Sequence, residues 1–179
     1  YNVKGNAMYE DLCKELHVPF KRCGSLVIAF NEEDMEHIRE LYERGQKNGV
    51  PKLHIIDRVK TKELEPHIQD GVIGALYSET AGIVGPWELT IALVENAVQN
   101  GVDLFLENKV KKIEKISDGF KVTTDKGAYE TKKIINCGGI YADEIHNLIA
   151  KPTFKITPRK GEYFVLDKTQ GEKIHRTIF

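Results

Sequence analysis

The sequence is poor in the features that mark several large classes of protein. Its 26 Lys and Arg residues are balanced by 27 Asp and Glu residues, so no excess of positive charge favours nucleic-acid binding. The longest uninterrupted apolar run has five residues, 26–30, whereas a helix that crosses a bilayer needs roughly 20. With 41% hydrophobic and 30% charged residues, the composition is that of an ordinary globular protein.

Cysteine is rare and histidine is scattered. The three cysteines, Cys13, Cys23 and Cys137, form no CxxC pair, which favours reduced thiols in a cytoplasmic protein. None of the six histidines forms an HxxxH pair, so we expect no metal site. The patterns GxGxxG, GxxxxGK[ST] and GxSxG are also missing, so residues 1–179 contain neither common phosphate-binding loop and no nucleophile elbow.

The two ends of the sequence resemble the interior of a protein. The chain opens on Tyr1, directly inside a helical pattern, and closes on Thr177, Ile178 and Phe179, an apolar triplet that favours a β-strand. We therefore expect this sequence to be a piece of a longer protein.

Apolar periodicity predicts a mixed α/β chain. Helices are expected over 1–17, from Asn31 to Gly49, from Asp57 to Pro66, over 87–100 and over 141–150. Strands are expected over 25–30, 53–56, 72–78, 102–106, 110–116, 120–124, 128–131, 133–137, 154–156 and 162–166. The turns 117–119 and 125–127 each end in glycine and are short, which predicts an antiparallel meander. The helix over 87–100 is apolar on nearly every side and should be covered on most of them.

Two glycines at the end of a predicted buried strand are the most informative local feature. Gly138 and Gly139 would let the backbone approach a ligand closely, beyond the carboxyl end of a strand, where ligands bind in open α/β sheets. A tight strand-to-helix turn explains the same pair equally simply. Cys137, just before them, fits a buried structural thiol better than a nucleophile, because no histidine accompanies it in sequence.

Cations are concentrated near the C-terminal end of the chain. Arg159 lies in a Pro-Arg-Lys-Gly turn and Arg176 opens the last strand-like segment. Arginine can hold a carboxylate or a phosphate with two parallel hydrogen bonds, so each is a candidate for binding an anionic substrate. Solvated surface charge is the simpler interpretation of each, and no catalytic base is identified.

Taken in order, the motifs resemble the middle of a flavoprotein of the D-amino-acid oxidase superfamily. The resemblance is closest to the FAD-dependent glycerol-3-phosphate dehydrogenases and L-2-hydroxyglutarate oxidases, and it covers essentially the whole chain. The segments that carry it are PFKRCGSLV (19–27), LEP (64–66), AGIVGP (81–86), Val110, IINCGGIYAD (134–143) and PRKGEY (158–163).

This resemblance implies a partial Rossmann-like FAD-binding domain with an inserted antiparallel meander, together with a substrate domain built on an antiparallel sheet. Residues 1–19 would be a helix that leads from a missing N-terminal part, 20–85 the first part of the substrate domain, 86–151 the centre of the FAD-binding domain and 152–179 the second part of the substrate domain. The family's N-terminal GxGxxG unit would precede Tyr1, so we expect the isolated chain to bind FAD weakly and to be inactive.

The resemblance also implies roles for single residues. Val110 would offer main-chain groups to the adenine, and the backbone of Cys137, Gly138 and Gly139 would lie near the FAD pyrophosphate. Cys-Gly-Gly here replaces the family's commoner Ala-Ala-Gly. Arg176 matches an arginine that binds the substrate phosphate, with Arg159 as a weaker candidate.

The resemblance implies an enzyme that oxidises sn-glycerol-3-phosphate to dihydroxyacetone phosphate by hydride transfer to FAD. A 2-hydroxy acid such as L-2-hydroxyglutarate, or an amino acid, would suit the same arginines, and a non-catalytic α+β module is the rival from another class. The expected partner is a small anionic molecule and not a nucleic acid. The electron acceptor, and any association of the complete enzyme with a membrane surface, stay open.

Overall fold

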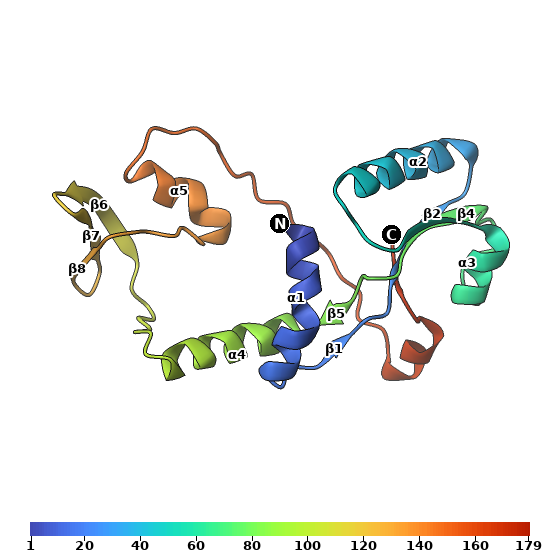
Figure 1. The fold of residues 1–179 in the computed structure, drawn as a ribbon, viewed down its shortest axis with the longest axis horizontal. Coiled ribbons are helices and arrows are strands. Elements are labelled where there is room, and N and C mark those ends of the chain that lie inside the picture. The colour runs from blue at the N-terminus through green and yellow to red at the C-terminus, as the bar shows by residue number, and fades with distance from the viewer. The chain divides into compact units, whose positions relative to one another are not determined.

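The computed structural model describes residues 1–179 and forms two compact units, Tyr1–Val102 with Val165–Phe179, and Asp103–Phe164 (Figure 1). Helices and sheets occur in both, which confirms the mixed α/β class. None of the helices is long and apolar enough to cross a membrane. No three His, Cys, Asp or Glu side chains come together as ligands for a metal ion.

The first unit contains most of the regular structure. Its helices are α1 (Asn2–Glu15), α2 (Glu32–Lys47), α3 (Arg58–Leu64), α4 (Pro86–Gln99) and the 3₁₀ helix η2 (Lys168–Lys173). Its strands are β1 (Phe20–Lys21), β2 (Ser25–Ala29), β3 (Leu53–Asp57), β4 (Gly74–Ser78), β5 (Ile83–Val84) and β9 (Thr177–Ile178).

Four of these strands form a sheet in the order β3-β4-β2-β9. β4 is antiparallel to both β2 and β3, while β9 runs parallel to β2, with Leu26 opposite Ile178. Helix α2 covers one face of this sheet (Figure 1) and buries Ile38 against Ala29, Leu53 and Leu76. Side chains alternate across a strand, so Tyr77, next to Leu76 on β4, belongs to the opposite face.

Local side chains fix where α2 begins. The side chain of Asn31 accepts a hydrogen bond from the N–H of Asp34, and Asp34 Oδ2 in return accepts one from the N–H of Phe30, each at 2.9 Å. This reciprocal capping, together with the cap that Asp57 makes for α3 through the N–H of Lys60, confirms the predicted helix starts.

A second core joins α1 to α4. Cys13, Val18 and Leu89 are buried together, and β1 pairs with β5 beside them. The rest of α4 is less covered than its composition predicts: Trp87 is 77% exposed and Ile91 57%. The expectation that this helix is covered on most sides is wrong for residues 1–179, because only the α1 side of α4 has apolar partners in this chain.

The second unit is a three-stranded meander followed by short helices. Strands β6 (Val110–Ile116), β7 (Gly119–Thr124) and β8 (Ala128–Thr131) pair antiparallel in that order, as predicted. The predicted helix over 141–150 is a 3₁₀ turn, η1 (Gly139–Tyr141), and a shorter helix, α5 (Ala142–Asn147).

Four predicted strands do not form. Residues 102–106, 133–137, 154–156 and 162–166 have no strand structure, and Ile135, expected to be buried, is 87% exposed. The physical reason is that a strand needs a neighbour to take up its N–H and C=O groups, and no other strand in residues 1–179 pairs with these segments. The N–H of Ile156, for example, is bound by the Asp143 carboxylate instead.

Candidate functional site

The second unit contains a cavity of about 730 Å³ between the start of the meander and α5. This size falls within the roughly 300–1,000 Å³ of small-molecule and cofactor sites. Its lining residues are Asn108, Lys109, Val110, Lys111, Gly138, Tyr141, Glu144, Ile145 and Leu148. The structure thus brings two of the predicted cofactor residues, Val110 and Gly138, to one cavity.

Val110 begins β6, one of the two edge strands of the meander. The N–H of Asp125 donates to the carbonyl of Lys109, while the N–H of Thr124, opposite Val110, turns away to the carbonyl of Gly127. Because antiparallel pairs alternate, the N–H and C=O of Val110 face the free edge of β6. A flat heterocycle with a neighbouring donor and acceptor, such as adenine, could pair with these main-chain groups.

A shift of register after Val110 shapes this edge further. The pairing moves between Val110 and Lys112, which leaves Lys111 as the extra residue of a bulge. The Lys111 ammonium lies 2.9 Å from Asp125 Oδ1, and this hydrogen bond lowers the pKa of Asp125 below its ordinary value. Lys111 at the cavity is therefore held by a carboxylate that stays ionised at neutral pH.

Gly138 and Gly139 are both positions that demand glycine. A Cβ on Gly138 would lie only 2.5 Å from Ile145 Cδ1, so α5 packs directly against this backbone. Gly139 has φ +56°, a left-handed conformation that side chains disfavour, and no atom lies within 4 Å of its Cβ position. The open space beside Gly139 fits a group that approaches the backbone closely.

The side chain of Asn136 organises the glycine turn. Its Oδ1 accepts a hydrogen bond from the N–H of Gly138 at 3.1 Å, and its Nδ2 donates to the carbonyl of Ala142 at 2.7 Å. Asn136 was not among the residues predicted from the sequence to shape the site. An Asn two residues before a glycine that begins a turn is the local signal that could have identified it.

Cys137 differs from expectation. Its thiol is exposed instead of buried, and the side chain does not line the cavity. The prediction of a buried structural thiol is therefore wrong, and the reason is that the strand meant to bury it does not form. Any contact of Cys137 with a ligand here would be made by its backbone.

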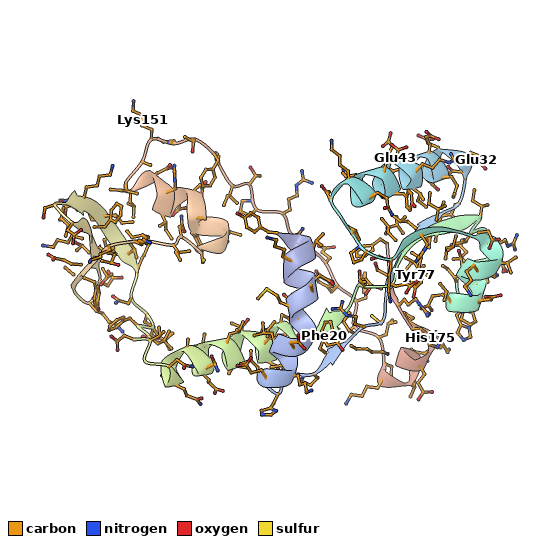
Figure 2. The ribbon with its side chains drawn as sticks, viewed as in Figure 1. Phe20, Glu32, Glu43, Tyr77, Lys151 and His175 are labelled. Carbon is orange, nitrogen blue, oxygen red and sulfur yellow. The ribbon has the colours of Figure 1, made fainter.

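Arg176 lies in the first unit, immediately before β9, and its side chain is 21% exposed. Its Nη1 donates to the carbonyl of Leu64 and lies 3.8 Å from Glu65 Oε1. The guanidinium carbon lies 5.8 Å from the centre of the Tyr77 ring, on the sheet face opposite α2. Figure 2 labels Tyr77 in the sheet and His175 on the segment that leads into β9.

Arg159 is solvent-exposed and forms no hydrogen bond or ion pair. Arg176, in contrast, has three different contacts, with the Leu64 carbonyl, the Glu65 carboxylate and the Tyr77 ring. Tyr77 and Glu65 complete this cluster. From the sequence, Glu65 was identifiable only as part of the Leu-Glu-Pro motif and Tyr77 was not identifiable, because nothing local links either residue to Arg176.

Comparison with known proteins decides the family. The FAD dependent oxidoreductase family matches residues 1–179, the whole of the sequence. The chain belongs to this family. A glycerol 3-phosphate dehydrogenase of Caloramator mitchellensis is 51% identical over 178 residues, which cover 99% of this chain and 37% of that protein. A glycerol 3-phosphate oxidase of Mycoplasma genitalium is 35% identical over 186 residues, which cover all of this chain and 48% of that one.

Among solved structures, the dithionite-reduced L-alpha-glycerophosphate oxidase of Mycoplasma pneumoniae with FAD bound is similar at a TM-score of 0.72. It is 26% identical, and the match covers 83% of this chain and 41% of that one. L-2-hydroxyglutarate dehydrogenases match at lower identity, such as 29% over 190 residues for the mitochondrial enzyme of Nematostella vectensis, covering 97% of this chain and 40% of that protein. Residues 1–179 thus span less than half the length of these relatives.

Membership in this flavoprotein family confirms the resemblance seen in the sequence, and the cavity is compatible with its cofactor. A free strand edge at Val110, a close-packed glycine at 138 and open space at Gly139 can receive parts of a dinucleotide. The rival interpretation of the chain as a non-catalytic module does not agree with membership in a family of oxidoreductases.

Proposed function

We propose that the complete protein containing this chain oxidises the C2 alcohol of sn-glycerol-3-phosphate to the ketone of dihydroxyacetone phosphate, with FAD as the hydride acceptor. The observation that carries this proposal is the 51% identity, across 99% of the chain, to a glycerol 3-phosphate dehydrogenase. FAD, when bound, supplies the electron-accepting ring, and the protein supplies binding and orientation.

The chain's own residues would divide this work between the two units. In the second unit, the main chain of Val110 would hold the adenine, and the backbone from Cys137 to Gly139 would approach the pyrophosphate. In the first unit, Arg176 would bind the substrate phosphate through charge-assisted hydrogen bonds. Arg159, exposed and unpaired, is the second candidate for the phosphate.

The test uses the complete protein, purified without added cofactor. We expect a visible flavin spectrum that glycerol-3-phosphate bleaches in the absence of oxygen, while L-2-hydroxyglutarate leaves it unchanged. Bleaching by the hydroxy acid alone would replace the proposed substrate. Absence of a flavin band, even after reconstitution with FAD, would contradict the proposal as a whole.

A 2-hydroxy acid is the second candidate substrate. Its support is the set of L-2-hydroxyglutarate dehydrogenases among the relatives, together with the ability of arginine to bind a carboxylate as well as a phosphate. The 35% and 51% identities to glycerol 3-phosphate enzymes favour the phosphate ester.

We also propose that residues 1–179 alone bind FAD weakly and do not turn over substrate. The pattern GxGxxG, which in this fold holds the cofactor phosphates at a helix N-terminus, does not occur in this sequence. Titration of the 179-residue chain with FAD, followed by flavin fluorescence, should give no stoichiometric complex at micromolar concentration. A tight one-to-one complex would disprove this expectation.

A further inference from the structure

Glu65 is the only carboxylate buried in the structure: the residue is 1% exposed. A buried carboxylate is costly unless its charge is paired and its oxygens accept hydrogen bonds. The partners of this carboxylate are His175 and Arg176, which lie more than 100 positions further along the chain. The N–H of His175 donates to both carboxylate oxygens, at 2.9 and 3.2 Å, and Arg176 Nη1 lies 3.8 Å from Oε1.

These contacts restrain Arg176 from two sides. The hydrogen bonds to the N–H of His175 fix the backbone just where β9 begins, and β9 in turn pairs with β2. The carboxylate and the carbonyl of Leu64 both attract Nη1, so that end of the guanidinium points inward. Nε is buried and makes no hydrogen bond.

The remaining donors of Arg176 are those of Nη2, which takes part in none of the hydrogen bonds of the structure. The guanidinium carbon also lies over the Tyr77 ring, 5.8 Å from the ring centre. A guanidinium held at Nη1 and against an aromatic ring presents its free edge in one fixed direction. Arginine used in this way binds an anion with less loss of side-chain entropy on binding.

We propose that Glu65 is a positioning residue for recognition of the anionic end of the substrate, acting through Arg176. This inference rests on the function proposed above, in which Arg176 binds the substrate phosphate. Glu65 does not touch the substrate in this arrangement. It holds Nη1 inward so that Nη2 meets the phosphate, and it supplies the countercharge that keeps the cation stable in a mostly buried position.

The experiment measures steady-state kinetics of the complete flavoenzyme with glycerol-3-phosphate, with rates normalised to flavin content. We expect Glu65→Gln to raise KM about tenfold while kcat changes by less than about twofold, because a hydrogen bond to a charged group that is lost on binding costs about tenfold or more in affinity. Glu63→Gln is the matched control: Glu63 lies in the last turn of α3, two residues before Glu65, and its side chain is 58% exposed. It should leave KM unchanged.

A double-mutant cycle separates positioning from a merely structural role. Arg176→Lys keeps the charge but loses the two-pronged donor geometry, and should raise KM by itself. Adding Glu65→Gln to Arg176→Lys should then change KM by less than about twofold. If Glu65→Gln raises KM equally in both backgrounds, Glu65 does not act through Arg176 and the inference is wrong.

A second substitution at the same position serves as the control for loss of folding. Glu65→Asp keeps the negative charge but shortens the side chain, so it should fold and raise KM by an intermediate factor. An unchanged KM for Glu65→Asp together with an unchanged KM for Glu65→Gln would overturn the inference while leaving the proposed function intact.

An unchanged KM for Arg176→Lys would instead remove the role of Arg176, and with it that of Glu65. Failure of glycerol-3-phosphate to reduce the flavin of the unaltered enzyme would contradict the function itself.

Discussion

Ile145 Cδ1 occupies the space that a side chain on Gly138 would need: a Cβ there would lie 2.5 Å from it. The glycine turn and α5 are therefore packed as one piece beside the cavity, and the size of residue 138 sets how closely they approach.

Gly138→Ala should reduce FAD binding by the complete protein. The added methyl group must displace either Ile145 or the backbone at the cavity, at a cost on the order of 1–3 kcal/mol. The ratio of flavin absorbance to protein after purification measures the effect. Gly5→Ala is the control, because Gly5 lies within α1 with no atom near its Cβ position, and this change should stabilise the fold by about 0.5–1 kcal/mol. Full flavin content in Gly138→Ala would contradict the placement of the cofactor here.

Gly24→Ala tests how tightly Tyr77 is held near Arg176. Gly24 has φ +74°, and a Cβ on it would lie 2.7 Å from Tyr77 Cε2. The substitution combines backbone strain of about 1–2 kcal/mol with displacement of the ring. We expect both a lower free energy of unfolding and a raised KM for the anionic substrate.

The matched control for Gly24→Ala is Gly49→Ala. Gly49 has the same φ of +74° but no atom within 4 Å of its Cβ position. It should show the backbone strain alone, measured by urea unfolding, with KM unchanged. Equal effects on KM from both variants would mean that Tyr77 has no part in substrate binding.

Asp143 links the segment after α5 to the helix itself. Its Oδ2 accepts a hydrogen bond from the N–H of Ile156 at 2.9 Å, and this bond is the main reason that the pKa of Asp143 lies below its ordinary 3.8. A lowered pKa means that the contact contributes its full stability above about pH 4. The contribution is lost as the pH falls through the still lower pKa of the folded state.

Amide hydrogen exchange measures this contact directly. Protection of the Ile156 N–H should be constant near neutral pH, after correction for the intrinsic exchange rate, and should decline below about pH 4. Asp143→Ala should remove the protection at every pH. Asp103→Asn, at an exposed carboxylate with no hydrogen bond, should leave it unchanged. Persistent protection in Asp143→Ala would show that another group orders this segment.

Ile38 anchors α2 to the sheet and is 1% exposed. Ile38→Ala removes apolar contacts with Ala29, Leu53 and Leu76 and leaves a cavity, which should lower the free energy of unfolding by about 2–5 kcal/mol. Urea denaturation followed by circular dichroism measures the change. Val59→Ala, at a position 67% exposed, should change stability by less than about 0.5 kcal/mol. A loss below 1 kcal/mol for Ile38→Ala would contradict the assigned core.

Elements whose determinants are local were predictable from the sequence. The start of α2 follows from Asn31, whose side chain accepts from the N–H of Asp34, and from Asp34, whose side chain accepts from the N–H of Phe30. The meander follows from its two short glycine turns, since these fix the register of the strands on either side. The family resemblance came from motifs in order along the chain, and Val110 and Gly138 do line one cavity.

Strand predictions failed where the backbone has no partner. The segment 133–137 is apolar and β-branched enough to form a strand. A strand also needs a neighbouring strand to bind its N–H and C=O groups, and composition does not show whether one is present. Without a neighbour within residues 1–179 it stays unpaired, so Cys137 is exposed where burial was expected.

The helix caps, the hairpins and the turn at Gly138 and Gly139 depend on interactions among residues a few positions apart, so they could be predicted from the sequence. The parallel pairing of β9 with β2, and the contacts of Glu65 with His175 and Arg176 more than 100 residues away, became visible only in the folded chain. Such a contact leaves no periodic trace in the chain. Such a contact depends on which strands pair. Because the entropy cost of closing a loop rises only slowly with loop length, distance along the chain does not indicate which residues will meet.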